Sequence, residues 1–130
     1  MDITSWRENG PTPITILQLK GDLVADEALA TRATAAFNDG ARNLVLDLSH
    51  VPYISSAGLR AIHTVYMLLR DADTNEAANA VQGIAHGTYK SPHLKLVKPS
   101  KNALKALSTA GYDMFLEIHD SIPAAVQSFK

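Results

Sequence analysis

Apolar and polar positions alternate near the start of the chain, and this alternation predicts two strands. Segment 14–20 places Ile14 on one face and Leu17 on the other. A shorter strand at 3–8 precedes it, and the turn at 10–13 contains two prolines. Because proline cannot donate to a strand ladder, the turn separates two strands that can form a hairpin at a sheet edge.

The middle of the chain carries the strongest pattern. Segment 43–48 is apolar on both faces except for Asp47, which predicts a central strand covered on at least one side. Segment 56–70 then carries an apolar stripe with spacings of three, four and three, which predicts an amphipathic helix. The stripe consists of Leu59, Ile62, Tyr66 and Leu69. Several polar or flexible side chains lie mostly away from it: Arg60, His63, Thr64, Met67 and Arg70.

Weaker signals predict the remaining elements. These are a helix capped by Asp26 and stopped at 38–40, a strand at 93–97, a helix that follows Pro99-Ser100, a strand at 114–118, and a last helix capped by Ser121. We expect the helix after Ser100 to bury Leu104 and Leu107, with Ala103 as a further candidate, and the last helix to bury Val126 and Phe129.

Segment 71–91 is polar and rich in alanine, with no large apolar face. It predicts a flexible insertion, and an extra helical turn is the alternative. The alternation of strands and helices predicts one α/β domain over residues 1–130. We expect a mixed central sheet of four to five strands with about four helices, because the connections at 49–92 and 99–112 are long enough for parallel crossovers.

Composition excludes several classes of function. The 130 residues are 46% hydrophobic and carry a net charge of −1, so no basic footprint for nucleic acid is expected. The chain has no cysteine, and its five histidines show no paired metal-ligand spacing. No apolar run approaches the roughly 18 residues of a membrane span. These features predict a small cytoplasmic domain with neither a metal site nor a cofactor.

The start of the helix at 56–70 holds the candidate chemistry, in the order Ser55-Ser56-Ala57-Gly58. Serine at a helix start is most often a cap whose hydroxyl accepts from free backbone N–H groups. Glycine inside a helix costs roughly 0.5–1 kcal/mol relative to alanine. Gly58 therefore indicates close packing or close approach by a partner, and packing is the commoner reason.

The motif extends beyond the serines. The strand end Leu46-Asp47-Leu48, the pair Tyr53-Ile54 and the run 55–59 together resemble the STAS domain family of the anti-sigma factor antagonist type. The turn Gly21-Asp22-Leu23 and the strand exit Lys98-Pro99-Ser100 resemble it as well. The likeness covers the element order from about 14 to 129, and the long segment 71–91 departs from it.

The resemblance implies a regulatory binding protein rather than an enzyme. By it, the chain binds an anti-sigma factor that is a serine kinase, frees a sigma factor, and is reset by a metal-dependent serine phosphatase. ATP and metal belong to those partners, and the free chain is expected to be a monomer. Ser56 falls on the family's phosphorylated position, with Ser55 as the rival because it stands where many members have aspartate. The partner surface implied by the resemblance and by the helix pattern comprises Gly21, Asp22, Asp47, Ser55, Ser56, Gly58, Arg60, Thr64 and Met67.

Three other readings stay open at this point. The first is a constitutive STAS subunit of a transporter or signalling scaffold, which the serine at position 55 favours. The second is a nucleotide-binding module, although no phosphate-cradling loop is present. The third is a hydrolase that combines Ser55, His63 and Asp47, although no nucleophile-elbow pattern supports it.

Overall fold

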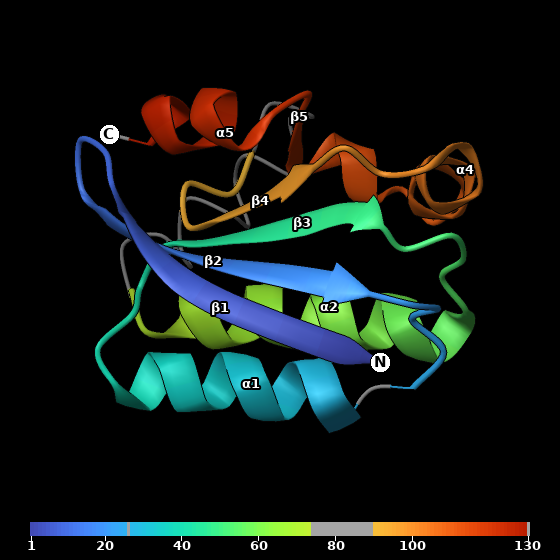
Figure 1. Cartoon of the computed structure of the whole chain (residues 1–130), viewed down its shortest axis with the longest axis horizontal. Helices are drawn as coiled ribbons and strands as arrows, with labels where there is room; N and C mark the ends of the chain where they lie inside the picture. The colour runs from blue at the N-terminus through green and yellow to red at the C-terminus, as the bar shows by residue number, and fades with distance from the viewer. Residues whose placement is uncertain (26, 74–89, 130) are drawn as a thin grey trace.

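A five-stranded mixed sheet forms the centre of the molecule. The computed structural model describes residues 1–25, 27–73 and 90–129. The strands are β1 (Asp2–Asn9), β2 (Pro13–Lys20), β3 (Leu44–His50), β4 (Leu94–Val97) and β5 (Glu117–His119). They lie side by side in chain order, with β1 antiparallel to β2 and the others parallel (Figure 1). The predicted hairpin and mixed sheet are confirmed.

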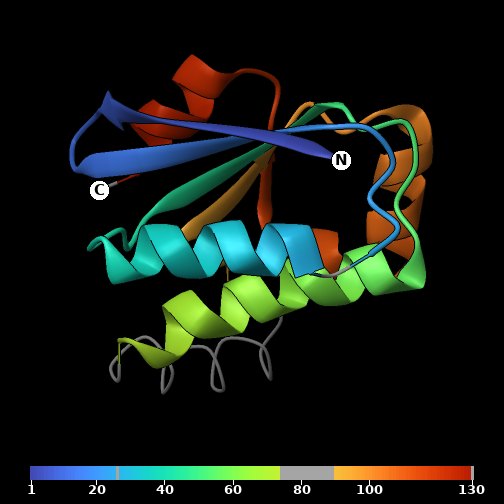
Figure 2. The ribbon, with the colours of Figure 1, turned by 60° about the horizontal axis from the view of Figure 1, so that its bottom comes forward.

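Helices cover both faces of this sheet. The described residues form α1 (Glu27–Asn38), α2 (Ser56–Asp71), α4 (Lys101–Thr109) and α5 (Ile122–Ser128), with a short 3₁₀ turn η1 (Tyr112–Met114) after α4. α1 and α2 lie side by side below the sheet, and α5 lies on the opposite face (Figure 2). The predicted number of helices is therefore confirmed for the part of the chain that is described.

Alternation along the strands divides the core into two layers. Leu17 of β2 and Leu46 of β3 pack with the inner faces of α1, α2 and α4. Ile16 of β2 and Val45 of β3 point the other way and pack with Val126 and Phe129 around α5. The predicted split of the strand faces and the burial of Val126 and Phe129 are confirmed.

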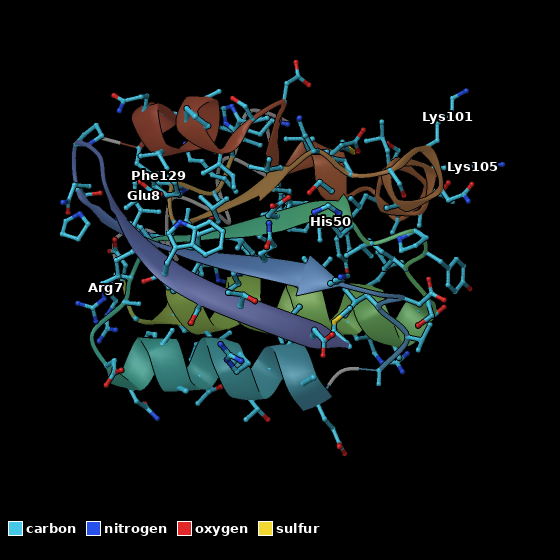
Figure 3. The ribbon with its side chains drawn as sticks, viewed as in Figure 1. Arg7, Glu8, His50, Lys101, Lys105 and Phe129 are labelled. Atoms are coloured by element: carbon cyan, nitrogen blue, oxygen red, sulfur yellow. The ribbon has the colours of Figure 1, made fainter. Side chains whose placement is uncertain are left out.

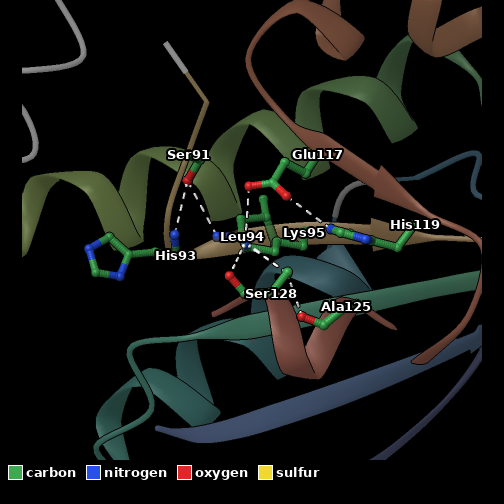
Figure 4. A network of polar contacts seen from close by, with 8 residues as sticks. All are labelled: Ser91, His93, Leu94, Lys95, Glu117, His119, Ala125 and Ser128. Carbon is green, nitrogen blue, oxygen red and sulfur yellow. Dashed lines mark hydrogen bonds and ion pairs between the residues drawn. The ribbon is translucent and has the colours of Figure 1, made fainter. Parts of the chain in front are cut away.

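A buried lysine fastens α5 to the sheet. Lys95 lies on the α5 face of β4, and its Nζ donates to Glu117 Oε2 (3.0 Å) and to the Ser128 hydroxyl (2.9 Å) and carbonyl (3.2 Å) (Figure 4). Glu117 also pairs with His119 at 3.0 Å. Every buried polar side-chain atom among the described residues has a partner, so the charge of Lys95 is compensated.

Three sequence predictions about burial or element ends are wrong. Leu104 is 41% exposed. α4 packs on the core through Ala103 and Leu107, which are four residues apart and share one face, and Leu104 lies outside that face. The strand expected at 114–118 begins only at Glu117, since Tyr112–Met114 form the 3₁₀ turn. β3 also extends to His50 rather than ending at Leu48.

Two further predictions fall largely outside the described residues. The Asp26 cap and positions 74–89 of the predicted insertion are among the residues that are not described. Near the end of that segment, Ser91 is buried and its N–H donates to Phe115 O at 2.8 Å. Within the described residues, no helix combines the length and the hydropathy that a bilayer crossing requires.

Candidate functional site

The carboxyl ends of β2 and β3 meet at one edge of the sheet, and the loops that follow them are joined there. Leu23 N–H donates to Tyr53 O, and Ser55 N–H donates back to Leu23 O, each at 2.9 Å. Gly21 begins this loop with φ +109°, a backbone conformation that disfavours other residues, and its N–H donates to His50 O at 3.0 Å. These three hydrogen bonds join the two loops to each other at the start of α2.

Ser55 is part of these joined loops. Its backbone is extended (φ −86°, ψ 176°), and its Oγ accepts from Gly58 N–H at 3.2 Å as the N-cap of α2. The same hydroxyl donates to Leu23 O at 3.4 Å. Ser55 thus joins the helix start to the preceding loop, as the capping interpretation predicts.

Ser56 is the first residue of α2, and its side chain is exposed. Among the described residues, no hydrogen bond or ion pair engages its hydroxyl. The start of a 16-residue helix carries free N–H groups and a partial positive charge, which favour a negative group placed there. Of the two serines, Ser56 is the one whose hydroxyl is open to an enzyme.

Gly58 is required by close packing. A Cβ at this position would lie 2.2 Å from Leu23 O, 2.9 Å from Leu23 Cγ and 3.0 Å from Ile54 Cγ2. Because the first of these contacts is with backbone, no rotation of a side chain can relieve it. Packing of α2 against the two loops therefore explains the glycine without a partner.

Asp47 is also structural. It is 3% exposed, and its carboxylate accepts from Gln18 Nε2 and from Ser49 N–H, each at 3.0 Å. Burial opposes ionisation, but these hydrogen bonds favour the charged form, so the pKa of Asp47 is lowered from its usual value. In this conformation Asp47 and Gly58 cannot touch a partner directly, and they act on the expected surface only by positioning its loops.

The remaining residues of the expected partner surface lie at or near the protein surface. Ser56, Arg60 and Thr64 are exposed and recur every four residues, so they line one side of α2. Asp22 is exposed on the adjoining loop. Met67 is half-buried because it packs against the edge of the core.

Comparison with known proteins assigns this arrangement to a family. The family model described as the STAS domain matches residues 6–75, more than half of the chain. The chain belongs to the STAS domain family. No curated protein matches it in sequence.

Solved structures of low sequence identity share the fold. An anti-sigma factor antagonist from Mycobacterium paratuberculosis is 19% identical, with TM-score 0.65 over 95% of this chain and 91% of that chain. The anti-sigma factor antagonist SpoIIAA in its unphosphorylated form is 14% identical, with TM-score 0.55 over 93% and 92%. The protein TM1081 from Thermotoga maritima is 22% identical, with TM-score 0.58 over 86% and 83%.

The STAS domain carries exposed apolar residues at this edge that sequence reasoning missed. Val24 and Tyr53 are 52% and 51% exposed on the two joined loops. A third loop joins them, because Ser100 Oγ donates to Val51 O at 3.0 Å. Tyr53 and Ser100 are part of the family motif, but helix and strand periods carry no information about which loop side chains face solvent.

The hydrolase arrangement is not assembled in this STAS domain. Asp47 is held by Gln18 and Ser49, whereas His63 lies beside the rings of Tyr66 and Tyr112, at 5.9 Å and 6.4 Å between centroids. Ser55 is used as a helix cap. A nucleophile, a base and an orienting acid in mutual contact are needed for that chemistry, and these three residues do not provide them.

Proposed function

We propose that this STAS domain is an anti-sigma factor antagonist whose binding is switched by phosphorylation of Ser56. One observation carries the proposal: an exposed, unengaged serine begins α2 directly after the serine that caps it. Capping is thereby assigned to Ser55, which leaves Ser56 open to modification. Ser55 is the rival acceptor, and its two hydrogen bonds argue against it.

The structural neighbours support the same class of function. SpoIIAA and the Mycobacterium paratuberculosis protein are described as anti-sigma factor antagonists, and SpoIIAA was solved in its unphosphorylated form. Such a role needs a protein-binding surface rather than catalytic groups. The exposed Ser56, Arg60 and Thr64 on α2 and the exposed Asp22, Val24 and Tyr53 on the loops supply one.

Phosphorylation at this position changes the surface and leaves the fold intact. A phosphoserine adds about −1.5 to −2 charges. The fold tolerates the group because Ser56 is exposed and the free N–H groups at the start of α2 can face it. A partner surface shaped around a neutral hydroxyl would instead meet a large dianion. A loss of about 3–4 kcal/mol would weaken binding roughly 200- to 1,000-fold.

The partner in this proposal is an anti-sigma factor of the serine-kinase type. The unphosphorylated chain binds it in the cytoplasm and so frees a sigma factor. The kinase then transfers phosphate from ATP to Ser56 and releases the chain, and a metal-dependent serine phosphatase restores the hydroxyl. The chain itself contributes binding residues only.

Capture experiments test the proposal. Ser56→Ala and Ser56→Asp variants are immobilised and exposed to native cytoplasmic extract, with Thr34→Asp as a control that adds charge at an exposed position of α1. We expect Ser56→Ala and Thr34→Asp to retain a serine kinase and Ser56→Asp to lose it. Equal capture by all three variants would favour the constitutive subunit, the second candidate, whose support is the serine at position 55.

A further inference from the structure

α4 presents a basic face with an apolar centre. Leu104 is exposed between Lys101 and Lys105, while Ala103 and Leu107 bury the opposite side of the helix. Both lysines project outward from α4 (Figure 3). None of the ion pairs among the described residues involves them. Exposed cations with no ion-pair partner among the described residues favour an acidic partner, and Leu104 adds apolar area that such a partner can bury.

The position of these cations is unfavourable for the isolated helix. Lys101 is the first residue of α4, Lys98 lies just before it, and the first turn contains no acidic residue. The start of a helix carries a partial positive charge, so lysines there are repelled and carboxylates are favoured. The arrangement does not stabilise α4, and an acidic group from outside the chain would neutralise it.

α4 is continuous with the proposed partner surface. Ser100 caps α4 by accepting from Ala103 N–H at 3.2 Å, and it donates to Val51 O at 3.0 Å and Pro52 O at 3.3 Å. These bonds fix the first turn of α4 beside the loop that carries Tyr53. Tyr112 Oη, just after α4, donates to Leu59 O of α2 at 2.8 Å. The Tyr112–Leu59 hydrogen bond therefore fixes the position of the α4–η1 segment relative to α2.

Exposed charges are unevenly distributed across this edge of the sheet, although Lys20 lies next to the acidic group and Asp120 follows β5 near the lysines. Asp22 and Glu27 are exposed on the β2–α1 side, and Lys98, Lys101 and Lys105 are exposed on the α4 side. Val24 and Tyr53 are exposed on the loops of the same edge. Such an arrangement selects the orientation of a partner, because the wrong orientation brings like charges together.

We infer that α4 is the second half of the partner surface and receives an acidic segment of the anti-sigma factor. An apolar side chain of that segment packs on Leu104, and its carboxylates face Lys101 and Lys105. This inference rests on the proposed function. It gives the complex a contact apart from Ser56 that steers and orients the partner.

Binding kinetics of charge variants test the inference. The probe is the kinase retained by the Ser56→Ala variant. We expect Lys105→Glu to lower its association rate about tenfold at low salt and to flatten the salt dependence. The matched control is Arg7→Glu, because Arg7 is exposed at the opposite end of the sheet (Figure 3). Equal association rates for the two variants would overturn the inference and leave the proposed function standing.

Photo-crosslinking locates the contact directly. A benzoylphenylalanine replaces Leu104 in one variant and Met114, which is 68% exposed on η1, in the other. We expect the kinase to crosslink to position 104 through an acidic segment and not to position 114. Crosslinking through a basic segment, or from position 114 alone, would contradict the inference.

Two further outcomes show whether the inference about α4 or the proposed function itself is wrong. Binding of the wild type to phosphatidylglycerol vesicles that is lost in Lys105→Glu would assign the face to a membrane and overturn the protein partner. If the Ser56→Ala variant retains no kinase at all, the proposed function fails and the inference fails with it.

Discussion

Two adjacent serines at the start of α2 have different surroundings, because one is hydrogen-bonded as a cap and the other is exposed. Ser55 lies at the cap position, where an extended backbone turns its hydroxyl back onto Gly58 N–H. Ser56 lies one residue later, where the helical backbone turns the side chain to solvent. The same residue type therefore supplies a cap at one position and an accessible hydroxyl at the next.

This division predicts different stabilities for the two alanine variants. Ser55→Ala should lower the free energy of unfolding by roughly 0.5–2 kcal/mol, because it removes the cap. Ser56→Ala should stay within about 0.5 kcal/mol of the wild type, as an exposed substitution does. Urea unfolding followed by circular dichroism gives both values. Equal losses in the two variants would mean that Ser56 shares the capping role.

Gly58 should behave opposite to an ordinary helical glycine. Replacement by alanine normally gains about 1 kcal/mol in a helix. Here the added Cβ meets Leu23 O, so we expect Gly58→Ala to lose roughly 1–3 kcal/mol net. Thr64→Ala, at an exposed position of the same helix, is the control and should change stability little. A stabilised Gly58→Ala variant would show that the loop moves aside freely.

Asp47 should make stability depend on pH. Its pKa is lowered in the folded state, so its stabilising contribution is complete above the unfolded pKa of about 3.9 and is lost as the pH falls through the folded pKa. Asp47→Asn keeps one oxygen that can accept from Ser49 N–H, but it replaces the other oxygen by an NH₂ donor that faces Gln18 Nε2 and removes the charge. We expect a loss of about 1–3 kcal/mol at pH 7.

A pH series distinguishes the contribution of the Asp47 carboxylate from a loss of stability that does not depend on ionisation. The difference between wild type and Asp47→Asn should shrink as urea midpoints are measured from pH 5 downward. Asp22→Asn, an exposed acid at the same edge, serves as the control and should stay within about 0.5 kcal/mol. A difference that does not change with pH would rule out the carboxylate as its source.

At the scale of elements, α5 depends on a buried charge network. Glu117→Gln would leave Lys95 with a weaker partner, and we expect about 1–3 kcal/mol of destabilisation. The double variant Lys95→Met/Glu117→Gln should recover part of this loss, because it removes the buried lysine charge together with its counter-charge. Thermal unfolding of the four proteins in the cycle measures the coupling. Additive losses would show that the pair is not coupled.

Periodicity predicts that an element is present more accurately than it predicts the residue at which the element ends. The apolar stripe of α2 and the alternation in β2 are read correctly because each matches a burial pattern of the same period. Leu104 is misplaced because two leucines on one short helix suggest one face, whereas the helix packs through Leu107 and the smaller candidate Ala103. The strand at β5 is misplaced because Gly111 (φ +82°) leads into a 3₁₀ turn that extends to Met114.

At the scale of the whole molecule, the hairpin and the parallel crossovers follow from the order of elements alone. The site follows only in part. Ser55, Ser56 and Gly58 are adjacent in sequence, so a motif finds them. The surface around them is assembled by hydrogen bonds between loops, such as Leu23 with Tyr53 and Ser100 with Val51. Those contacts join residues far apart in the chain, and local patterns cannot supply them.

One titration tests the central claim most directly. The captured kinase is titrated calorimetrically with the chain in two forms, unmodified and fully phosphorylated at Ser56 as verified by mass spectrometry. We predict that the phosphorylated form binds roughly 200- to 1,000-fold more weakly, while its circular dichroism spectrum and unfolding midpoint stay close to those of the unmodified form. Equal affinity of the two forms for the kinase would contradict the switch.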